Sequence, residues 1–174
     1  PHKHLTIQYR KCKSEIELMA KFLEHWRNDY PDVITGWNIR FFDIPYLLNR
    51  VVRVLGENEA RRFSPWGQIH QKKINVMHRE QLAYDIVGVQ QLDYMDLFKK
   101  FGYKYGNQES YRLGHVSQVV LGDTKVDYSD LGSLKNMYEN DYRRFVDYNV
   151  VDVNLLERME DKTGFINLVQ TMAY

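Results

Sequence analysis

The sequence predicts an α/β domain, and three observations support this fold class. Apolar residues recur at helical spacing in several segments, beginning with Ile16, Met19 and Leu23. Short apolar runs, such as residues 33–35, separate these segments and have the length of buried strands. The chain has 174 residues, of which 44% are hydrophobic and 14% aromatic, so it can form the packed core of about one domain. Helices that alternate with short strands are typical of the α/β and α+β classes.

Helix signals and apolar runs place the elements of the N-terminal half. Ser14 and Glu17 form a capping box, which predicts that a helix begins beside them. Pro45 suits the first turn of a helix, and Gly56 is typical of a residue that follows one. The expected elements are a helix at residues 15–28, a strand at 32–37, a helix at 43–55, a short helix at 57–63, and a hairpin with strands at 72–76 and 82–89. The hairpin turn is expected near residues 77–81, where no Asn-Gly or Asp-Gly pair defines its type.

The C-terminal half is predicted to be mostly helical. Asp96 is expected to cap one helix, and Ser110 is expected to cap another that Gly122 closes. Asp93 is likewise assigned a structural role, and Gly164 interrupts the last helical pattern. The expected elements are a strand at residues 92–95, helices at 96–101, 110–121, 133–138, 140–162 and 165–174, and loops at 102–109 and 123–131.

Composition limits the possible functions. The formal net charge is +1, so any contact with nucleic acid must come from a local patch. Cys12 is the only cysteine, which excludes a disulfide framework and the usual zinc sites and fits a reducing compartment. No apolar run reaches the ~20 residues of a membrane-spanning helix, and no signal-peptide pattern opens the chain.

One acidic residue lies inside an apolar stripe. Asp152 has Tyr148 four residues before it and Leu156 four residues after it, and such residues share a helix face. The stripe consists of Tyr138, Tyr142, Phe145, Asn149, Asp152, Leu156 and Met159. A carboxylate buried there needs a charged partner, a proton or a metal ion. Considered alone, Asp152 is also consistent with a hydrogen-bonded structural acid, and Tyr148 with an aromatic residue of the core or its rim.

A second acidic residue lies where a predicted strand leads into a helix. The strand ends close to Asn38, and Asp43 begins the next helix. Such a junction is rigid and partly exposed, which suits a functional carboxylate. Considered alone, Asp43 is also consistent with the N-cap of that helix, accepting hydrogen bonds from backbone N–H groups.

Together, these segments resemble the exonuclease motifs of family B DNA polymerases. Asn-x-x-x-Phe-Asp at residues 38–43 and Tyr-x-x-x-Asp at residues 148–152 have the order and spacing of the second and third motifs. The sequence around them, at residues 35–46, 92–100 and 148–153, is similar to that of the proofreading domain of T-even-type phage replicative polymerases. The resemblance covers nearly the whole chain. It implies a ribonuclease H-like (DnaQ-like) α/β fold with an inserted β-hairpin, and a 3′→5′ exonuclease that removes misincorporated nucleotides from the primer 3′ end during DNA replication.

The resemblance also implies roles for five residues. Asp43 and Asp152 would be catalytic acids and ligands of a site that holds two Mg²⁺ or Mn²⁺ ions, which prefer oxygen ligands. Two such ions can activate a water molecule and stabilise the leaving oxygen of a phosphodiester displacement. Tyr148 would orient the attacking water or the scissile phosphate. Asn38 and Phe42 would line the slot for the 3′-terminal nucleotides, where aromatic rings stack on bases without reading their sequence.

The first motif of this family, Asp-x-Glu on an early strand, does not occur in the sequence. The closest acidic pair, Glu15 and Glu17, belongs to the predicted capping box. We therefore expect residues 1–174 to be a single domain, the C-terminal part of the exonuclease domain of a larger DNA polymerase, starting after the strands of the first motif. Because two carboxylates cannot hold both metal ions well, the fragment alone is predicted to have little or no nuclease activity.

The resemblance implies several partners. They are the single-stranded 3′ end of the primer, the primer–template DNA, the remainder of the polymerase and, through it, replisome proteins such as the sliding clamp. No membrane partner is expected, and the location would be the cytoplasm of the infected bacterial host. Two other functions stay open: a non-catalytic module that holds single-stranded DNA or packs against the polymerase, and a generic α/β domain whose acids serve only as caps. An Asp-x-Glu on a strand pattern before Pro1 in the parent gene would favour catalysis.

Basic residues are expected mainly on solvated surfaces. The pairs at residues 61–62 and 99–100 could contact phosphates, but such pairs are typical of solvated helix faces. Lys72, Lys73 and Arg79 belong to the predicted hairpin, which is either an ordinary solvated hairpin or, by resemblance, one that helps to part the primer end from the template.

Overall fold

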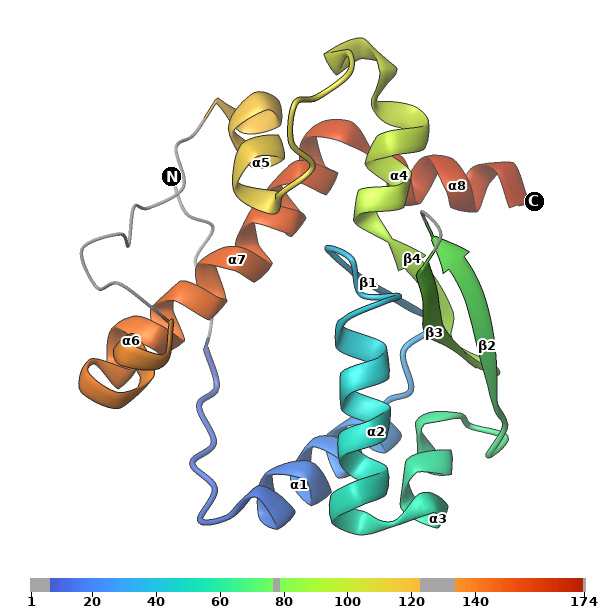
Figure 1. Cartoon of the computed structure of the whole chain (residues 1–174), viewed down its shortest axis with the longest axis vertical. Helices are drawn as coiled ribbons and strands as arrows, with labels where there is room; N and C mark the ends of the chain where they lie inside the picture. The colour runs from blue at the N-terminus through green and yellow to red at the C-terminus, as the bar shows by residue number, and fades with distance from the viewer. Residues whose placement is uncertain (1–6, 77–78, 123–133, 174) are drawn as a thin grey trace. The chain divides into compact units, whose positions relative to one another are not determined.

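The structure is a computed structural model that describes residues 7–76, 79–122 and 134–173, and its mixed α/β architecture confirms the predicted class (Figure 1). Its elements are α1 (Glu15–Asn28), β1 (Val33–Gly36), α2 (Asp43–Leu55), α3 (Glu57–Ala60), η1 (Arg61–Phe63), β2 (Ile69–Val76), β3 (Arg79–Ile86), β4 (Gln90–Asp93), α4 (Tyr94–Phe101), η2 (Gly102–Tyr105), α5 (Leu113–Leu121), α6 (Leu134–Asn140), α7 (Tyr142–Thr163) and α8 (Phe165–Ala173). Contacts divide the chain into two compact units, unit 1 (Pro1–Ile34 and Arg40–Gln91) and unit 2 (Thr35–Ile39 and Leu92–Tyr174). No helix among the described residues is long and apolar enough to cross a membrane.

Unit 1 is built from α1, α2, the short helices α3 and η1, and the hairpin of β2 and β3 (Figure 1). Contacts join α2 to α1, to α3 and to β3, and the α2 side chains Leu48 and Val51 are buried among them. Phe22, Trp26 and Phe63 form an aromatic cluster, in which the rings of Trp26 and Phe63 lie 5.2 Å apart. The indole Nε1 of Trp26 also donates a 2.9 Å hydrogen bond to the Phe63 carbonyl, so its polar atom is satisfied where its ring is packed.

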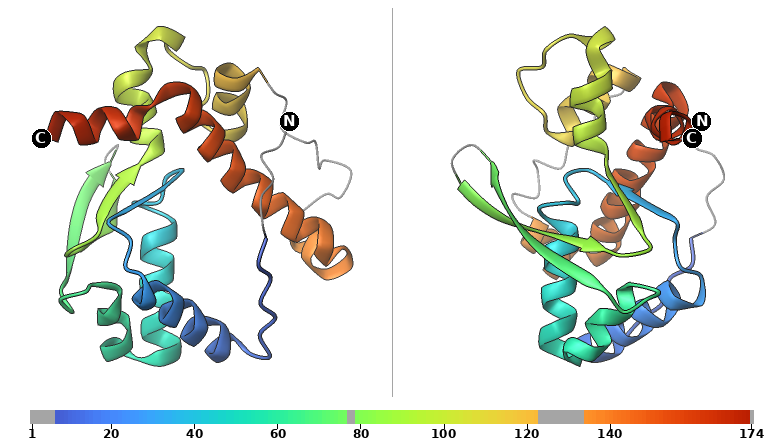
Figure 2. Two further views of the ribbon diagram at one scale, coloured as in Figure 1. Left: turned by 180° about the vertical axis from the view of Figure 1, so that it is seen from behind. Right: turned by 90° about the vertical axis from the view of Figure 1, so that its right-hand side faces the viewer.

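A hairpin is present in the predicted region, but its predicted strand bounds are wrong. The two strands are antiparallel, from Ile69 opposite Ile86 to Val76 opposite Arg79, and Figure 2 shows them side by side along their length. They begin at residues 69 and 79 rather than 72 and 82. Of the predicted turn, residues 77 and 78 lie outside the described residues. Because the sequence carries no two-residue turn signature, local chemistry does not define the register, and pairing along the two strands decides it.

β1 and β4 form a second sheet of two strands. The N–H of Gln90 donates to the Asp32 carbonyl at 2.8 Å, and Oγ1 of Thr35 donates to the Leu92 carbonyl at 2.7 Å. The residue numbers rise together along both strands, which is the order of a parallel pair. A parallel pair needs a long crossover connection, and here α2, α3 and the hairpin lie in the chain between the two strands.

Unit 2 contains the helices α4 to α8, with α7 in contact with α5 and α6, and α4 in contact with α8. Its core holds Tyr94 and Phe98 from α4 and Phe165 from α8. The ring centroid of Phe165 lies 6.1 Å from that of Tyr94 and 6.5 Å from that of Phe98. Gly164 has the left-handed φ of 65° at the end of α7, and the chain changes direction there into α8 (Figures 1 and 2). The predicted helix break at Gly164 is therefore confirmed.

The predicted cap of α4 is wrong. β4 ends at Asp93 and α4 begins at Tyr94, two residues before the predicted start. Asp93 is the N-cap, and its side chain accepts a 3.0 Å hydrogen bond from the N–H of Met95. Asp96 lies inside the first turn instead. Aspartate is one of the preferred N-cap residues, and this signal could have identified Asp93 as the cap.

The predicted start of α5 is also wrong. The helix begins at Leu113 after the N-cap Arg112, and Oγ of Ser110 accepts from the N–H of Arg112 before the helix starts. Gly122 closes α5 in the left-handed conformation, as predicted. The loop predicted at 102–109 begins with the short helix η2, and α7 begins two residues later than predicted. The predicted start of α6 at residue 133 and the loop predicted at 123–131 lie outside the described residues.

Candidate active site

The first candidate segment, Thr35–Ile39, is held within unit 2 by side-chain contacts along its length. Oγ1 of Thr35 bonds to the Leu92 carbonyl, as described above, and Nε1 of Trp37 donates to the Tyr111 carbonyl at 3.0 Å. Ile39 is buried. Gly36 is buried against it, because a Cβ atom at position 36 would lie 2.1 Å from Cγ2 of Ile39. The backbone on both sides of Asn38 is therefore fixed.

Asn38 has an unusual backbone conformation that Asp93 supports. Its φ of 64° makes it the only non-glycine residue with a positive φ among those described. Asparagine tolerates this left-handed region better than most residues. The N–H of Asn38 donates to Oδ1 of Asp93 at 3.1 Å, and the same oxygen accepts from the N–H of Met95 at 3.0 Å. Asp93 is only 7% exposed, and both bonds are partly buried.

Helix α7 carries two of the predicted catalytic residues, Tyr148 and Asp152, one turn apart and both half-buried. Oδ1 of Asp152 is shielded from solvent although the residue as a whole is half-buried. A carboxylate oxygen in that position needs a cation or a hydrogen-bond donor. Carboxylate oxygens are also the kind of ligand that a hard divalent cation prefers.

The apolar stripe around Asp152 is only partly present. Met159 is fully buried and Leu156 is half-buried, but Asn149, Tyr138 and Tyr142 are exposed. Instead, the two tyrosine rings pack against each other and against the ring of Phe145, with the tyrosine ring centroids 5.5 Å apart. The buried residues of α7 are Asn154, Leu155 and Met159, so the helix is buried mainly in its C-terminal half.

Phe42 and Asp43 lie next to each other at the start of α2 in unit 1. Phe42 is the N-cap and Asp43 is the first helical residue, so the alternative of Asp43 as the N-cap is wrong. The helix N-terminus still favours its negative charge. Asp43 is half-buried, whereas the Phe42 side chain is 68% exposed. An exposed ring beside a carboxylate is suited to stacking on a base of single-stranded nucleic acid.

The predicted site residues are thus divided between the two units. Phe42 and Asp43 belong to unit 1, whereas Asn38, Tyr148 and Asp152 belong to unit 2. A shared metal site of Asp43 and Asp152 stays a prediction. Within the described ranges, no three or more His, Cys, Asp or Glu side chains form a group that could hold a metal ion. Asp43 and Asp152 therefore stay candidate ligands, of the oxygen-donor type that hard divalent cations prefer.

The basic residues considered in the sequence have partners inside the chain. The guanidinium groups of residues 61 and 62 pair with Glu57 at 3.3 Å and with Glu59 at 3.0 Å. The ammonium groups of residues 99 and 100 lie 5.2 Å and 5.3 Å from the ring centres of Tyr111 and Phe101. On the hairpin, residues 72 and 73 pair with acids of the facing strand, residues 85 and 80. These pairings agree with solvated surfaces rather than a basic nucleic-acid patch.

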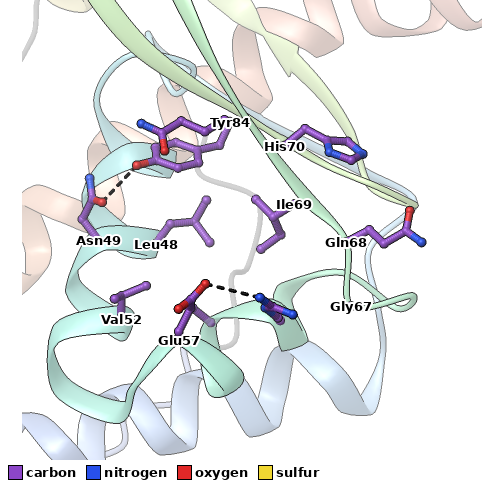
Figure 3. A pocket seen from close by; sticks show the side chains of 12 residues that line it. Leu48, Asn49, Val52, Glu57, Gly67, Gln68, Ile69, His70 and Tyr84 are labelled. Atoms are coloured by element: carbon purple, nitrogen blue, oxygen red, sulfur yellow. Dashed lines mark hydrogen bonds and ion pairs between the residues drawn. The ribbon is translucent and has the colours of Figure 1, made fainter.

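A cavity of about 510 Å³ lies in unit 1 between α2, α3 and the hairpin (Figure 3). At one side, the hydroxyl of Tyr84 donates a 3.0 Å hydrogen bond to Oδ1 of Asn49. The ion pair of Glu57 and Arg61 also lines the cavity, and Figure 3 shows Leu48 among the labelled residues between these polar groups. Among the described residues that line it, none is a predicted site residue. The candidate site is therefore elsewhere in the chain.

Comparison with known proteins gives a family-level match. A family model described as "DNA polymerase family B, exonuclease domain" matches residues 2–116 of the chain. The match includes the segment from Asn38 to Asp43 and the cap Asp93, and it extends over parts of both units.

Curated relatives match over a longer range. The DNA-directed DNA polymerases of Enterobacteria phage T4 and Escherichia phage RB69 are each 36% identical over 168 residues, which cover 97% of this chain and 18% of the relative. The DNA polymerase delta catalytic subunit of Candida albicans is 33% identical over 153 residues, which cover 80% of this chain and 14% of the relative. The chain thus spans about a fifth of the length of the phage relatives.

Proposed function

Because the chain belongs to the exonuclease domains of the family B DNA polymerases, we propose that it serves as a 3′→5′ proofreading exonuclease domain during DNA replication. It would hydrolyse the phosphodiester bond at the primer 3′ end and so remove misincorporated nucleotides. The observation that carries the proposal is the 36% identity to two phage polymerases along 97% of the chain. That range contains all five residues that resemble the family's motifs.

The proposed fold is a single ribonuclease H-like domain made from both compact units. The family match supports it, because that match extends over parts of both units. The hairpin of β2 and β3 would be an insertion in this domain that acts where the primer end leaves the template.

Asp43 and Asp152 are the proposed ligands of divalent cations, Mg²⁺ or Mn²⁺. Bound cations of this kind supply an activated water and stabilise the charge that develops on the leaving oxygen. Asp152 is half-buried on α7, one helical turn from Tyr148, and its carboxylate is the type of ligand that such cations prefer. Two carboxylates are few for two ions, so we expect the chain by itself to have little nuclease activity.

The chain's own side chains would bind and orient the DNA end. The exposed ring of Phe42 would stack on a terminal base, and Asn38 would line the same slot. Tyr148 would orient the water or the scissile phosphate, because it lies one helical turn from Asp152 on α7. None of these contacts reads a base edge, which suits an enzyme that must accept any 3′ nucleotide.

The proposed partners follow from the same assignment. They are the single-stranded 3′ end of the primer, the primer–template DNA and the remainder of a polymerase chain, with replisome proteins such as the sliding clamp reached through that chain. The location would be the cytoplasm of the infected host, in keeping with the phage relatives.

Binding of Mn²⁺ tests the metal assignment. Titration of the chain with Mn²⁺, followed by electron paramagnetic resonance, is expected to reveal binding that Asp152→Asn and Asp43→Asn each weaken. Asp147→Asn is the matched control, because Asp147 is an exposed acid on the same helix as Asp152. Equal weakening by all three variants would contradict a specific role for Asp43 and Asp152.

Single-stranded DNA tests the activity. The chain is expected to bind an oligonucleotide with a free 3′ end and to release almost no mononucleotides from it in Mn²⁺. Robust release that Asp152→Ala abolishes would support the nuclease but contradict the predicted incompleteness. Binding of DNA without any effect of the metal-ligand variants on Mn²⁺ would favour the non-catalytic module, and absence of both Mn²⁺ and DNA binding would overturn the proposal.

A further inference from the structure

We propose that Asp93 is a positioning residue for Asn38, and this inference rests on the proposed role of Asn38 in the slot for the 3′-terminal nucleotides. Asp93 is 55 residues away from Asn38 in the chain, yet its Oδ1 accepts the Asn38 N–H at 3.1 Å. Asp93 touches neither DNA nor metal in this assignment. It acts through the backbone of Asn38, the residue proposed to contact the DNA.

The backbone at Asn38 needs such support. The left-handed region is sterically unfavourable for a residue that carries a side chain, and Asn38 is the only non-glycine residue there among those described. A hydrogen bond from its N–H to a buried carboxylate is stronger than one to a neutral acceptor. The bond therefore favours the strained conformation over the extended one, in which the Asn38 side chain would leave from a different direction.

The position of Asp93 is itself firmly defined. Its carboxylate is the N-cap of α4, and the residue is 7% exposed. The preceding residue, Leu92, accepts the hydrogen bond from Thr35, so the two chain segments are joined at consecutive residues. One carboxylate oxygen thus links the start of α4 to the candidate slot, and the geometry of Asn38 follows from that of the helix.

Two variants separate the cap from the contact with Asn38. Asp93→Asn keeps an oxygen at the same place, so it should retain both hydrogen bonds. Asp93→Ser keeps a good N-cap for α4, but its hydroxyl is one atom closer to the backbone and should no longer reach Asn38. Asp96→Ser is the matched control, because Asp96 is an exposed acid in the first turn of the same helix. If Asp93→Ser fails to fold, Asp93→Thr offers the same test.

Amide hydrogen exchange, read by NMR on the full chain, tests the contact without DNA. The Asn38 N–H is expected to be protected in the wild type and in Asp93→Asn. In Asp93→Ser it should exchange at least tenfold faster while the Met95 N–H stays protected. An unprotected Asn38 N–H in the wild-type chain, or unchanged protection in Asp93→Ser, would overturn the inference.

Affinity for a 3′-ended single strand of oligo(dT), measured by fluorescence anisotropy, tests the positioning. Asp93→Ser is expected to weaken binding about tenfold, from the loss of one charge-assisted hydrogen bond, and Asp93→Asn to restore most of the affinity. In an Asn38→Ala background, Asp93→Ser should have no further effect, whereas a merely structural role would give additive losses and overturn the inference. If the wild-type chain does not bind DNA at all, the proposed DNA-binding function fails, and the exchange result still decides whether Asp93 holds Asn38.

Discussion

The hydroxyl of Tyr94 donates a 2.9 Å hydrogen bond to Oε2 of Glu160, joining the first residue of α4 to the last turn of α7. The same carboxylate accepts from the N–H groups of Ile166 at 3.1 Å and Asn167 at 3.3 Å. These donors belong to the first turn of α8, where N–H groups lack partners within the helix. One acid therefore holds three helices of unit 2 together.

Replacing Glu160 should destabilise unit 2 strongly. We expect Glu160→Ala to lower the free energy of unfolding by about 2–3 kcal/mol, because two helix N–H groups lose their acceptor. The buried Tyr94 hydroxyl would keep only its 2.6 Å hydrogen bond with Oγ1 of Thr163. Glu160→Gln, which keeps an acceptor oxygen, should lose less. Urea unfolding followed by circular dichroism measures both. The control is Glu157→Ala at an exposed position of α7, and an equal loss there would contradict the assignment.

Stability should also depend on pH through Tyr94. Burial raises the pKa of the Tyr94 hydroxyl above its usual value of 10.0. The unfolded chain therefore loses this proton first, so the stability contributed by Tyr94 is full below about pH 10 and falls as the pH rises further. In Tyr94→Phe, the free energy of unfolding should fall less steeply with pH between about pH 9.5 and 11. The difference in slope should correspond to about one proton. Identical slopes in the two proteins would show that Tyr94 is not the group responsible.

Gly36 should not tolerate a side chain while Ile39 is present. A Cβ atom at position 36 would lie 2.1 Å from Cγ2 of Ile39, and both residues are buried. Gly36→Ala is expected to cost about 1–3 kcal/mol of stability, as overpacking of a core does. Leucine has no branch at Cβ, so adding Ile39→Leu should recover part of the loss. Thermal unfolding of the single and double variants measures the rescue, and additive losses would contradict a direct clash.

Phe42 should contribute to binding of single-stranded DNA. Stacking of one base on an aromatic ring is worth about 1–3 kcal/mol, so Phe42→Ala should weaken the affinity for oligo(dT) between five- and a hundredfold, roughly. Phe42→Tyr should retain it. Tyr103, which is 86% exposed in unit 2, provides the control. If Tyr103→Ala weakens binding as much as Phe42→Ala, the effect is not specific to the proposed slot.

The paired charges on the hairpin should not dominate DNA binding. Lys73 lies 2.7 Å from Glu80 across the two strands, and both side chains are largely exposed. Because the lysine charge is already balanced, Lys73→Gln should leave the salt dependence of DNA affinity unchanged. The affinity for DNA, measured at several salt concentrations from about 50 to 200 mM, checks this expectation. A clearly shallower slope in the variant would mean that Lys73 contacts phosphate.

Local signals predicted much of the helical structure. The capping box at Ser14 placed the first residue of α1, and the hydroxyl accepts from the Glu17 N–H at 3.2 Å. Gly56, Gly122 and Gly164 follow the helices that they were predicted to end. These signals act within one helical turn, so no knowledge of the rest of the chain was needed.

Strand bounds and the site geometry were predicted less well. The first hairpin strand begins three residues before its predicted start, and the second is displaced by three residues at both ends. The α4 cap was assigned to Asp96 instead of Asp93. The motifs singled out Asp43 and Asp152 as candidate ligands, and those roles stay predictions. The partner of the Asn38 N–H was missed altogether, because nothing close to Asn38 in the sequence marks it.

The sequence by itself determined the α/β class, the helices that carry Asp43 and Asp152, and the resemblance that indicated the family. Each depends on residue types at short spacing along the chain. Only the tertiary structure decided the strand register, the left-handed backbone of Asn38 and its bond to Asp93. Those features depend on contacts between residues far apart in the chain, 55 positions in the case of Asn38 and Asp93, whose geometry exists only after the strands have paired.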